Sequence, residues 1–408
     1  MKLLLVVMAA GLITFGLSTT VLAFHGGGVA HCDGCHTMHN TDGDGQPAIP
    51  GTTPGTGMNE HLTVGSDQSS TCLSCHEGSG SYHVASPPGD TTANLTAGGD
   101  FAWLKPTYSI DFGWTSRNVG GAKFGHNIIA ADFGYGPQNN PSAALTSSGF
   151  NGFPAAELAC SSCHDPHGKV PRSTLVYDPI IGSGSYGGYE SDGTTPLDLS
   201  EGIMGNYRLL GSKGYNPDGA IAPFDNPSPI AYATNADGYY SSKVDYGSGM
   251  SEWCANCHTG LNADGSEAHR HPASNGAHLD GEAANYNRYV ATGDYSGNVN
   301  DSYLGLVPFE RGETDPTMNL DPESTVGPDS NSNVMCLTCH RAHVGGFQNN
   351  GRWDFGTELL AESNPNPSSG GYPWTEMSGY YYGGDLIDIA TEFGHGQRSL
   401  CNKCHNQD

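Results

Sequence analysis

The chain has 408 residues, and its 42 acidic side chains against 16 Lys and Arg give a formal net charge of −26 at pH 7. This balance argues against a protein that binds nucleic acid or an anionic membrane, because both surfaces attract basic side chains. Charged residues make up only 14% of the chain, and 59 glycines with 25 prolines interrupt almost every segment. Long helices and regular strands are therefore not expected.

The N-terminus has the pattern of a secretory signal. Lys2 precedes a short apolar segment, residues 3–17, and residues 21–23 (VLA) are similar to a small-residue cleavage site. We expect a signal peptide over residues 1–23 that is cleaved, a mature chain that begins at Phe24, and export through the periplasm. The alternative is a membrane anchor, but the apolar run is short for a span. No later segment is apolar enough to cross a bilayer, so no transmembrane span is expected.

Few segments of the mature chain keep a helical or alternating pattern for long. The spacing predicts short helices over residues 154–164, 250–258, 282–292, 333–340 and 397–405. The rest reads as turns and ordered coil, so the expected fold class is mostly irregular coil with short helices and little strand.

All twelve cysteines belong to six copies of one pattern, Cys-x-x-Cys-His. The copies are Cys32, Cys35 and His36; Cys72, Cys75 and His76; Cys160, Cys163 and His164; Cys254, Cys257 and His258; Cys336, Cys339 and His340; Cys401, Cys404 and His405.

This pentapeptide is typical of covalent c-type haem attachment. The two thiols become thioethers to the haem, and the imidazole that follows ligates the iron as the proximal ligand. Zinc sites and thioredoxin-like redox sites are the alternatives. Zinc would pair the motifs without requiring a histidine after every second cysteine, and a redox motif would be expected once. The chain is therefore predicted to carry six haem c groups and to transfer electrons.

The spacing of the motifs indicates a shared core. Successive first cysteines lie 40, 88, 94, 82 and 65 residues apart, so no sequence repeat sets the architecture. About 64 mature residues per motif are too few for a separate globin-like pocket around each haem. We expect a single hexahaem domain over residues 24–408, with one continuous haem array supplying much of the core.

Twelve of the eighteen histidines lie outside the motifs, and six distal ligands are needed if every haem is bis-histidine. Methionine is the alternative ligand, but Met250 and Met335 lie close to motif cysteines rather than in a ligand context. Three motifs carry a second histidine three residues after the first: His39, His167 and His343. Such a histidine must serve a different haem if it is a ligand, and otherwise it hydrogen-bonds a propionate or a carbonyl.

Further distal candidates lie away from the motif cysteines. His83, His126 and His271 are the stronger ones, although His269 competes with His271. The weaker candidates are His25, His31, His61, His278 and His395.

Several segments resemble one known family. FHGGGVAHCDGCHTMHN at the expected mature N-terminus, GHNI (residues 125–128), CSSCHDPHGK, GMSEWCANCHT, RHPASNGA, CLTCHRAH and the terminal LCNKCH are similar to OmcS-like hexahaem c-type cytochromes. These are secreted proteins of metal-reducing bacteria that polymerise into conducting filaments. The resemblance runs from Phe24 to Asp408 and includes all six motifs in order.

The resemblance implies mostly coil structure, bis-histidine haems, and alternating parallel-stacked and T-shaped haem pairs along one line. It also implies head-to-tail assembly in which His39 ligates the fifth haem of the neighbouring subunit. The remaining distal ligands that it implies are His83, His126, His167, His271 and His343.

The predicted function is extracellular electron transfer along a filament. Donor cytochromes of the cell envelope would supply electrons, and external acceptors such as metal oxides or partner cells would receive them. A monomeric periplasmic or cell-surface shuttle is the first alternative. A multihaem reductase is the second, but it needs an open haem site, and every motif here ends in histidine. No catalytic residue is therefore assigned.

Overall fold

The protein is described by a computed structural model. It describes residues 32–36, 63–78, 83–86, 98–111, 116–121, 124–137, 153–154, 157–166, 169–170, 178–179, 209–211, 213–217, 222–233, 244–260, 271–289, 295–313, 320–321, 324–363, 367–369 and 396–406.

The elements are short and scattered along the chain. The α-helices are α2 (Cys32–Cys35), α3 (Gln68–His76), α5 (Met250–Cys254), α6 (Glu282–Tyr286) and α7 (Cys336–Cys339). The 3₁₀ helices are η1 (Phe101–Leu104), η3 (Ala131–Phe133), η5 (Cys160–Ser162), η7 (Gln348–Asn350), η8 (Leu360–Glu362) and η11 (Cys401–Lys403). The strands are β1 (Thr107–Asp111), β2 (Ser116–Gly120), β3 (Lys169–Val170), β4 (Asp178–Pro179), β5 (Ile230–Ala233), β6 (Val244–Ser248) and β7 (Pro367–Ser369).

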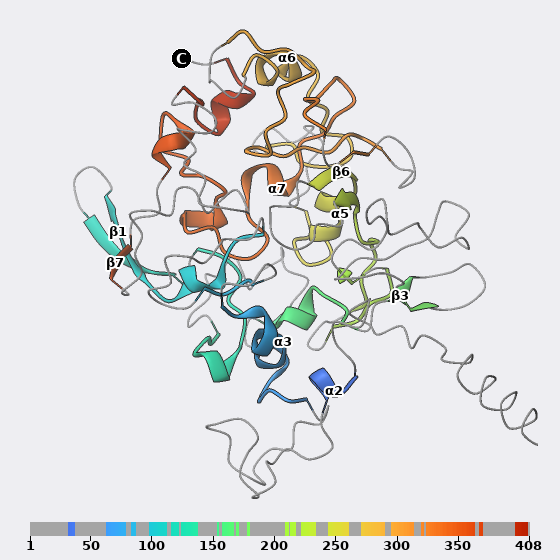
Figure 1. The fold of residues 1–408 in the computed structure, drawn as a ribbon, viewed down its shortest axis with the longest axis vertical. Coiled ribbons are helices and arrows are strands. Elements are labelled where there is room, and N and C mark those ends of the chain that lie inside the picture. The colour runs from blue at the N-terminus through green and yellow to red at the C-terminus, as the bar shows by residue number, and fades with distance from the viewer. Residues whose placement is uncertain are drawn as a thin grey trace, which may run out of the picture.

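The elements are spread along the long axis of the molecule. In Figure 1, α2 and α3 lie near the bottom, α5 and α7 lie in the middle, and α6 and the C-terminal segment lie at the top. Within the described residues, no helix has the length and apolar character that crossing a membrane requires.

The strands form three small antiparallel sheets among the described residues. β1 pairs with β2, from Thr107 opposite Gly120 to Asp111 opposite Ser116, and its other edge pairs with β7. β3 pairs with β4, and β5 pairs with β6 through an irregular register at Ile230. The predicted fold class, mostly coil with short helices and little strand, is confirmed.

The helices differ from the expected ones in length. Those expected over 154–164, 250–258, 282–292, 333–340 and 397–405 are each reduced to one turn or little more. Residues that precede these short helices form backbone hydrogen bonds with other segments, so they do not extend the helices. The carbonyl of Leu158 accepts from Ile129 N–H at 2.8 Å, and Val334 N–H donates to Ala277 at 2.9 Å.

The longest described helix, α3, was not predicted. It begins after Asp67, whose side chain accepts the Ser70 N–H at 2.7 Å and so caps the helix. It ends at Glu77, which adopts an extended conformation.

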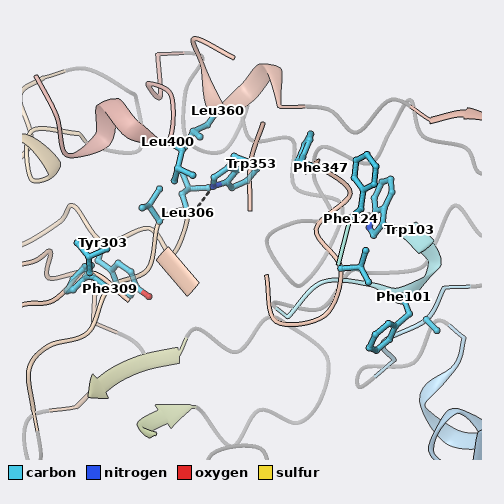
Figure 2. Packing of buried hydrophobic residues seen from close by; sticks show 14 of the residues in the cluster. Phe101, Trp103, Phe124, Tyr303, Leu306, Phe309, Phe347, Trp353, Leu360 and Leu400 are labelled. Atoms are coloured by element: carbon cyan, nitrogen blue, oxygen red, sulfur yellow. Dashed lines mark hydrogen bonds between the residues drawn. The ribbon is translucent and has the colours of Figure 1, made fainter. Parts of the chain in front are cut away.

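Buried side chains form a larger core than the composition suggested. One cluster extends from Phe101, Trp103 and Phe124 to Tyr303, Phe309 and Leu400 (Figure 2). Trp103 and Trp353 are fully buried, and the Trp353 indole donates to the Leu306 carbonyl at 2.8 Å.

A second cluster contains Met250 and Met335, which are 2% and 0% exposed. Side chains therefore supply more of the core than the high glycine content had led us to expect.

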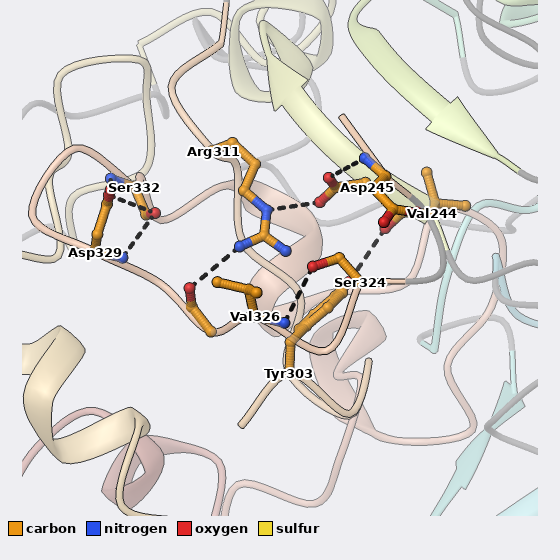
Figure 3. Close-up of polar contacts among 10 residues, drawn as sticks. Val244, Asp245, Tyr303, Arg311, Ser324, Val326, Asp329 and Ser332 are labelled. Carbon is orange, nitrogen blue, oxygen red and sulfur yellow. Dashed lines mark hydrogen bonds and ion pairs between the residues drawn. The ribbon is translucent and has the colours of Figure 1, made fainter. Parts of the chain in front are cut away.

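A buried ion pair ties β6 to the loops around residues 303–329. Arg311 Nε lies 2.7 Å from Asp245 Oδ1, and its Nη1 donates to the Gly327 carbonyl at 3.2 Å (Figure 3). The Tyr303 hydroxyl donates to the Val244 carbonyl at 3.1 Å. Burial raises the pKa of Asp245, and the Arg311 charge acts in the opposite direction. The pair fixes the chain just before α5, which carries the fourth motif.

Candidate functional site

Each Cys-x-x-Cys-His motif lies wholly or partly in a helix. In four of them the N–H of the motif histidine donates to the carbonyl of the first cysteine four residues earlier. The distances are 2.9 Å for His164 and Cys160, 2.9 Å for His258 and Cys254, 2.9 Å for His340 and Cys336, and 3.0 Å for His405 and Cys401. This turn brings both cysteines, at positions i and i+3, to one side of the helix.

The motifs follow one another in space in the order of the sequence. Cysteine side chains of successive motifs lie close enough to interact, from the first motif to the sixth. The interacting pairs are Cys35 and Cys72, Cys72 and Cys160, Cys163 and Cys257, Cys254 and Cys336, and Cys339 and Cys401. The attachment positions therefore form one row. The single domain over residues 24–408 stays a prediction.

Three motif histidines lie opposite a histidine from another part of the chain. The ring centroids are 5.9 Å apart for His126 and His258, 6.3 Å for His164 and His343, and 6.0 Å for His271 and His405. Two imidazoles that ligate one metal ion from opposite sides, through bonds of about 2 Å, hold their centroids about 6 Å apart. The three spacings fit an iron between each pair.

The ring nitrogens are arranged for ligation. Nδ1 of four histidines lies within hydrogen-bond distance of a backbone carbonyl: His126 at 2.8 Å from Ala342, His271 at 2.9 Å from Pro272, His340 at 2.9 Å from Asn349 and His343 at 3.3 Å from Gly99. Such a bond fixes the tautomer and directs Nε2 toward the metal.

Burial lowers the pKa of several of these imidazoles. It lowers the pKa of His258 to about 4, with smaller effects in the same direction from the nearby His126 and His340. It also lowers the pKa of His126 and of His340, against the effect of their bonds to backbone carbonyls. A neutral imidazole is the form that ligates a metal ion.

A glycine pair positions His343. The N–H of His343 donates to the Gly98 carbonyl at 2.7 Å, and the Gly99 carbonyl lies next to its ring. Gly99 has φ = +94°, and a Cβ there would overlap the Val344 carbonyl oxygen. Only glycine fits this position without strain.

His83 has a different environment. It is 2% exposed, and its Nε2 lies 3.8 Å from Asp100 Oδ2. Burial raises the pKa of Asp100, whereas hydrogen bonds from Ser86 and Ala102 act to lower it. Val84 N–H donates to the His76 carbonyl at 2.8 Å, so His83 lies beside the second motif along the backbone.

The two cysteines of a motif differ in environment. Burial is the main cause that raises the pKa of the second cysteines Cys163 and Cys404 to about 12 and that of Cys339 to about 11. Side-chain hydrogen bonds lower the pKa of the first cysteine Cys336 to about 7 and also lower that of Cys160. In the described part of the chain, no three or more His, Cys, Asp or Glu side chains are grouped as ligands of one ion. The candidate metal positions are pairs of histidines.

Part of the predicted site lies outside the described residues. His39, His167 and the side chain of Cys32 are among these, as are the weaker candidates His25, His31, His61, His269 and His395. His278 is exposed and lines a polar cavity of about 430 Å³ with Arg311 and Asn333.

Two residues that the sequence analysis did not select contact the motifs directly. Ser69 Oγ accepts the Cys160 N–H, and Ser251 Oγ accepts the Cys336 N–H, each at 3.0 Å. Both serines stand three residues before the first cysteine of their own motif. This common offset was visible in the sequence.

Comparison with known proteins gives a consistent result. No protein-family model matches the chain. The C-type cytochrome OmcS of Geobacter sulfurreducens is 38% identical over an alignment of 451 positions that covers 100% of this chain and 99% of that protein. The cryo-EM structure of OmcS nanowires from the same organism matches with a TM-score of 0.73 and 37% identity, covering 94% of this chain and all of the other. The outer membrane cytochrome S filament matches with a TM-score of 0.71 and 36% identity, at the same coverage.

Proposed function

The chain belongs to the OmcS family of C-type cytochromes, and from this membership we propose that it is a secreted electron carrier that assembles into extracellular filaments. Its six motifs would hold six covalent haems along one row, and electrons would pass along that row from subunit to subunit. The observation that carries the proposal is full-length similarity to subunits of solved cytochrome filaments.

The residues of each motif have defined parts in this function. Bound c-type haem supplies a one-electron couple at its iron. The two cysteines of each motif would hold the haem through thioether bonds, and the motif histidine would ligate its iron. The proximity of cysteines from successive motifs supports six sites in one series.

Distal ligands are assigned first from the histidine pairs. His343 would complete the third site with His164, His126 the fourth with His258, and His271 the sixth with His405; ring spacings near 6 Å support all three. His83, beside the second motif, would complete the site of His76.

A recurring backbone pattern supports the assignment of the other two ligands. In the first, third and fifth motifs, the motif histidine forms a β-bridge with a later residue, and the N–H of the next residue donates to the carbonyl of the second cysteine. These donors and acceptors are Val64 and Cys35 at 2.9 Å, Gly211 and Cys163 at 2.8 Å, and Arg352 and Cys339 at 2.7 Å. The same three motifs carry the second histidine three residues later.

Because the first, third and fifth motifs share this backbone pattern, we expect the second histidine of each to have the same role as a distal ligand of another motif's haem. His343 of the fifth motif lies beside His164 of the third. The same relation would bring His167 of the third motif to His36 of the first. The first motif begins this series within the chain, so its second histidine, His39, has no earlier site to ligate. His39 would therefore ligate the fifth site, at His340, in a neighbouring subunit.

A ligand donated across the subunit interface has a geometric consequence. The interface joins two different surfaces, so each added subunit leaves the same two ends free. Assembly then continues as an open filament, and every junction contains a coordination bond.

Charge and export favour particular partners. With a net charge of −26, the filament would attract basic surfaces on donor cytochromes and positively charged oxide surfaces. Cleavage of residues 1–23 and passage through the periplasm would place the mature chain outside the cell.

Two other functions make different predictions. A soluble shuttle would keep His39 within its own subunit. A reductase would have an open iron site, and the reduced protein would then bind carbon monoxide at one haem. No observation favours the shuttle or the reductase over the filament.

Electron microscopy of the secreted haem protein tests the proposal, and the matched variants are His39→Ala and His278→Ala. Wild type and His278→Ala should form filaments with one unbroken row of haems. His39→Ala should give short, soluble species, because its neighbour loses the distal ligand at His340. Full-length His39→Ala filaments, or discrete wild-type particles, would contradict the proposal.

A further inference from the structure

The junctions between the second and third motifs and between the fourth and fifth motifs are built alike. The helix that carries the earlier motif packs against the helix of the later one: α3 against η5, and α5 against α7. At both junctions a serine hydroxyl from the earlier motif contacts the first cysteine of the later motif. Ser69 contacts Cys160, and Ser251 contacts Cys336.

Each serine makes one hydrogen bond to the backbone of that cysteine. Its Oγ accepts the backbone N–H at 3.0 Å. Both serines are 0% exposed, so water does not compete for these bonds.

The cysteine amides need such a partner. Each cysteine begins its helix, where the first N–H groups have no acceptor within the helix. The N–H of the preceding residue is satisfied inside the motif, since Ala159 donates to Ser162 Oγ at 2.9 Å and Met335 donates to Thr338 Oγ1 at 3.1 Å. The next N–H, on the cysteine itself, is satisfied by the serine of the earlier motif.

The two first cysteines also meet at each junction. The side chains of Cys72 and Cys160 lie next to each other, as do those of Cys254 and Cys336. These four sulfurs are the attachment atoms of four different haems in the proposed function. The serines would therefore act where the attachment positions of successive haems come together.

We propose that Ser69 and Ser251 are positioning residues that set the relative orientation of the second and third haems and of the fourth and fifth haems. The proposal rests on the proposed function, because it needs the motifs to carry haem. Each serine acts through the cysteine that it holds and does not touch the reacting iron. Three residues before the first cysteine of the sixth and last motif stands Arg398 instead of a serine. The serine contact is therefore a feature of the junctions within the chain.

The test compares Ser69→Ala and Ser251→Ala holoproteins with Ser363→Ala. Ser363 is also 0% exposed, and its Oγ also accepts a backbone N–H, that of Asp354 at 2.8 Å, but it lies outside the motifs. Two readouts are combined with haem content. Hydrogen exchange reports the Cys160 and Cys336 amides, and circular dichroism in the Soret region reports excitonic coupling between neighbouring haems, which depends on their mutual angle.

Ser69→Ala should speed hydrogen exchange at the Cys160 amide, and Ser251→Ala should speed it at the Cys336 amide. Each variant should lose part of the bisignate Soret signal, with all six haems retained. The double variant should lose more of the signal. Ser363→Ala should match wild type at both cysteine amides and in the Soret signal, and Ser69→Thr and Ser251→Thr, which keep the hydroxyl, should recover the signal.

Unchanged exchange and an unchanged Soret signal in both alanine variants would overturn the proposal. Loss of haem in those variants would also overturn it, because the serines would then be required for folding and not for orientation. A wild-type protein that forms no filaments would bear on the proposed function alone, since the comparison is made between holoproteins in the same state of assembly.

Discussion

At the scale of single residues, the histidine rings show how coil can orient side chains without long helices. No long helix is needed to aim His126, His271, His340 or His343, because a backbone carbonyl from a neighbouring loop lies at Nδ1 of each ring. The bond restrains the ring and increases the basicity of the other nitrogen. In bis-histidine haems, this favours the oxidised iron and a low reduction potential.

His343→Ala should open one iron. The variant removes the imidazole opposite His164, so the reduced protein should bind about one equivalent of carbon monoxide in its visible spectrum. His278→Ala is the matched control, because it removes an exposed histidine and should bind none. Carbon monoxide binding by neither variant would contradict the assignment of His343.

Glu310 is a buried carboxyl beside the fourth and fifth motifs. It is 0% exposed, and its Oε1 accepts the Met250 N–H at 2.7 Å. Among the described residues no partner lies within hydrogen-bond distance of Oε2. Burial is the main cause that raises the pKa of Glu310 from 4.5 to about 8, and nearby Glu252 acts in the same direction.

This raised pKa makes stability depend on pH. The folded state holds a proton on Glu310 that the unfolded state releases above pH 4.5, so the free energy of unfolding should fall as the pH rises from about 4.5 to about 8. Glu310→Gln cannot ionise and should lose this part of the slope, with a gain at pH 8 of up to about 5 kcal/mol relative to wild type. Denaturant titrations between pH 5 and pH 9 measure the effect.

The control for this prediction is Glu358→Gln, which removes an equal charge from an exposed position. It should leave the slope as in wild type. Parallel pH profiles for wild type and Glu310→Gln would show that Glu310 does not hold a proton in the folded protein.

At the scale of elements, α3 is stabilised by one carboxylate. Asp67 accepts the Ser70 N–H at 2.7 Å and the Ser70 hydroxyl at 2.8 Å. The same side chain accepts the Ala131 N–H at 2.7 Å. It therefore caps the helix of the second motif and joins it to η3.

Asp67→Ala should lower the free energy of unfolding by about 1–2 kcal/mol, because it leaves these donors without their acceptor. Asp67→Asn keeps a side-chain oxygen at the cap and should lose less. Thermal or denaturant unfolding of the holoproteins gives the comparison. Equal stability of Asp67→Ala and wild type would mean that packing alone holds α3.

At the scale of the whole molecule, the motif row replaces the layered architecture of ordinary domains. The described sheets are small. The sheet of β1, β2 and β7 lies at one side of the molecule, whereas β6 is buried beside α5, and the side-chain core occupies the space between loops (Figures 1 and 2). An array of this kind tolerates irregular backbone, since each loop is fixed by local hydrogen bonds and by the sites that it forms.

The sequence by itself determined the haem chemistry, the fold class and the family, because Cys-x-x-Cys-His is a local signal that needs no tertiary context. It also identified His126, His271 and His343 as distal candidates, though not which motif each one faces. Only the tertiary structure decided those pairings, the contacts of Ser69 and Ser251 with the next motif, and the burial of Glu310. Each of these depends on loops far apart in the chain coming together, and no periodic pattern in a glycine-rich coil records how such loops pack.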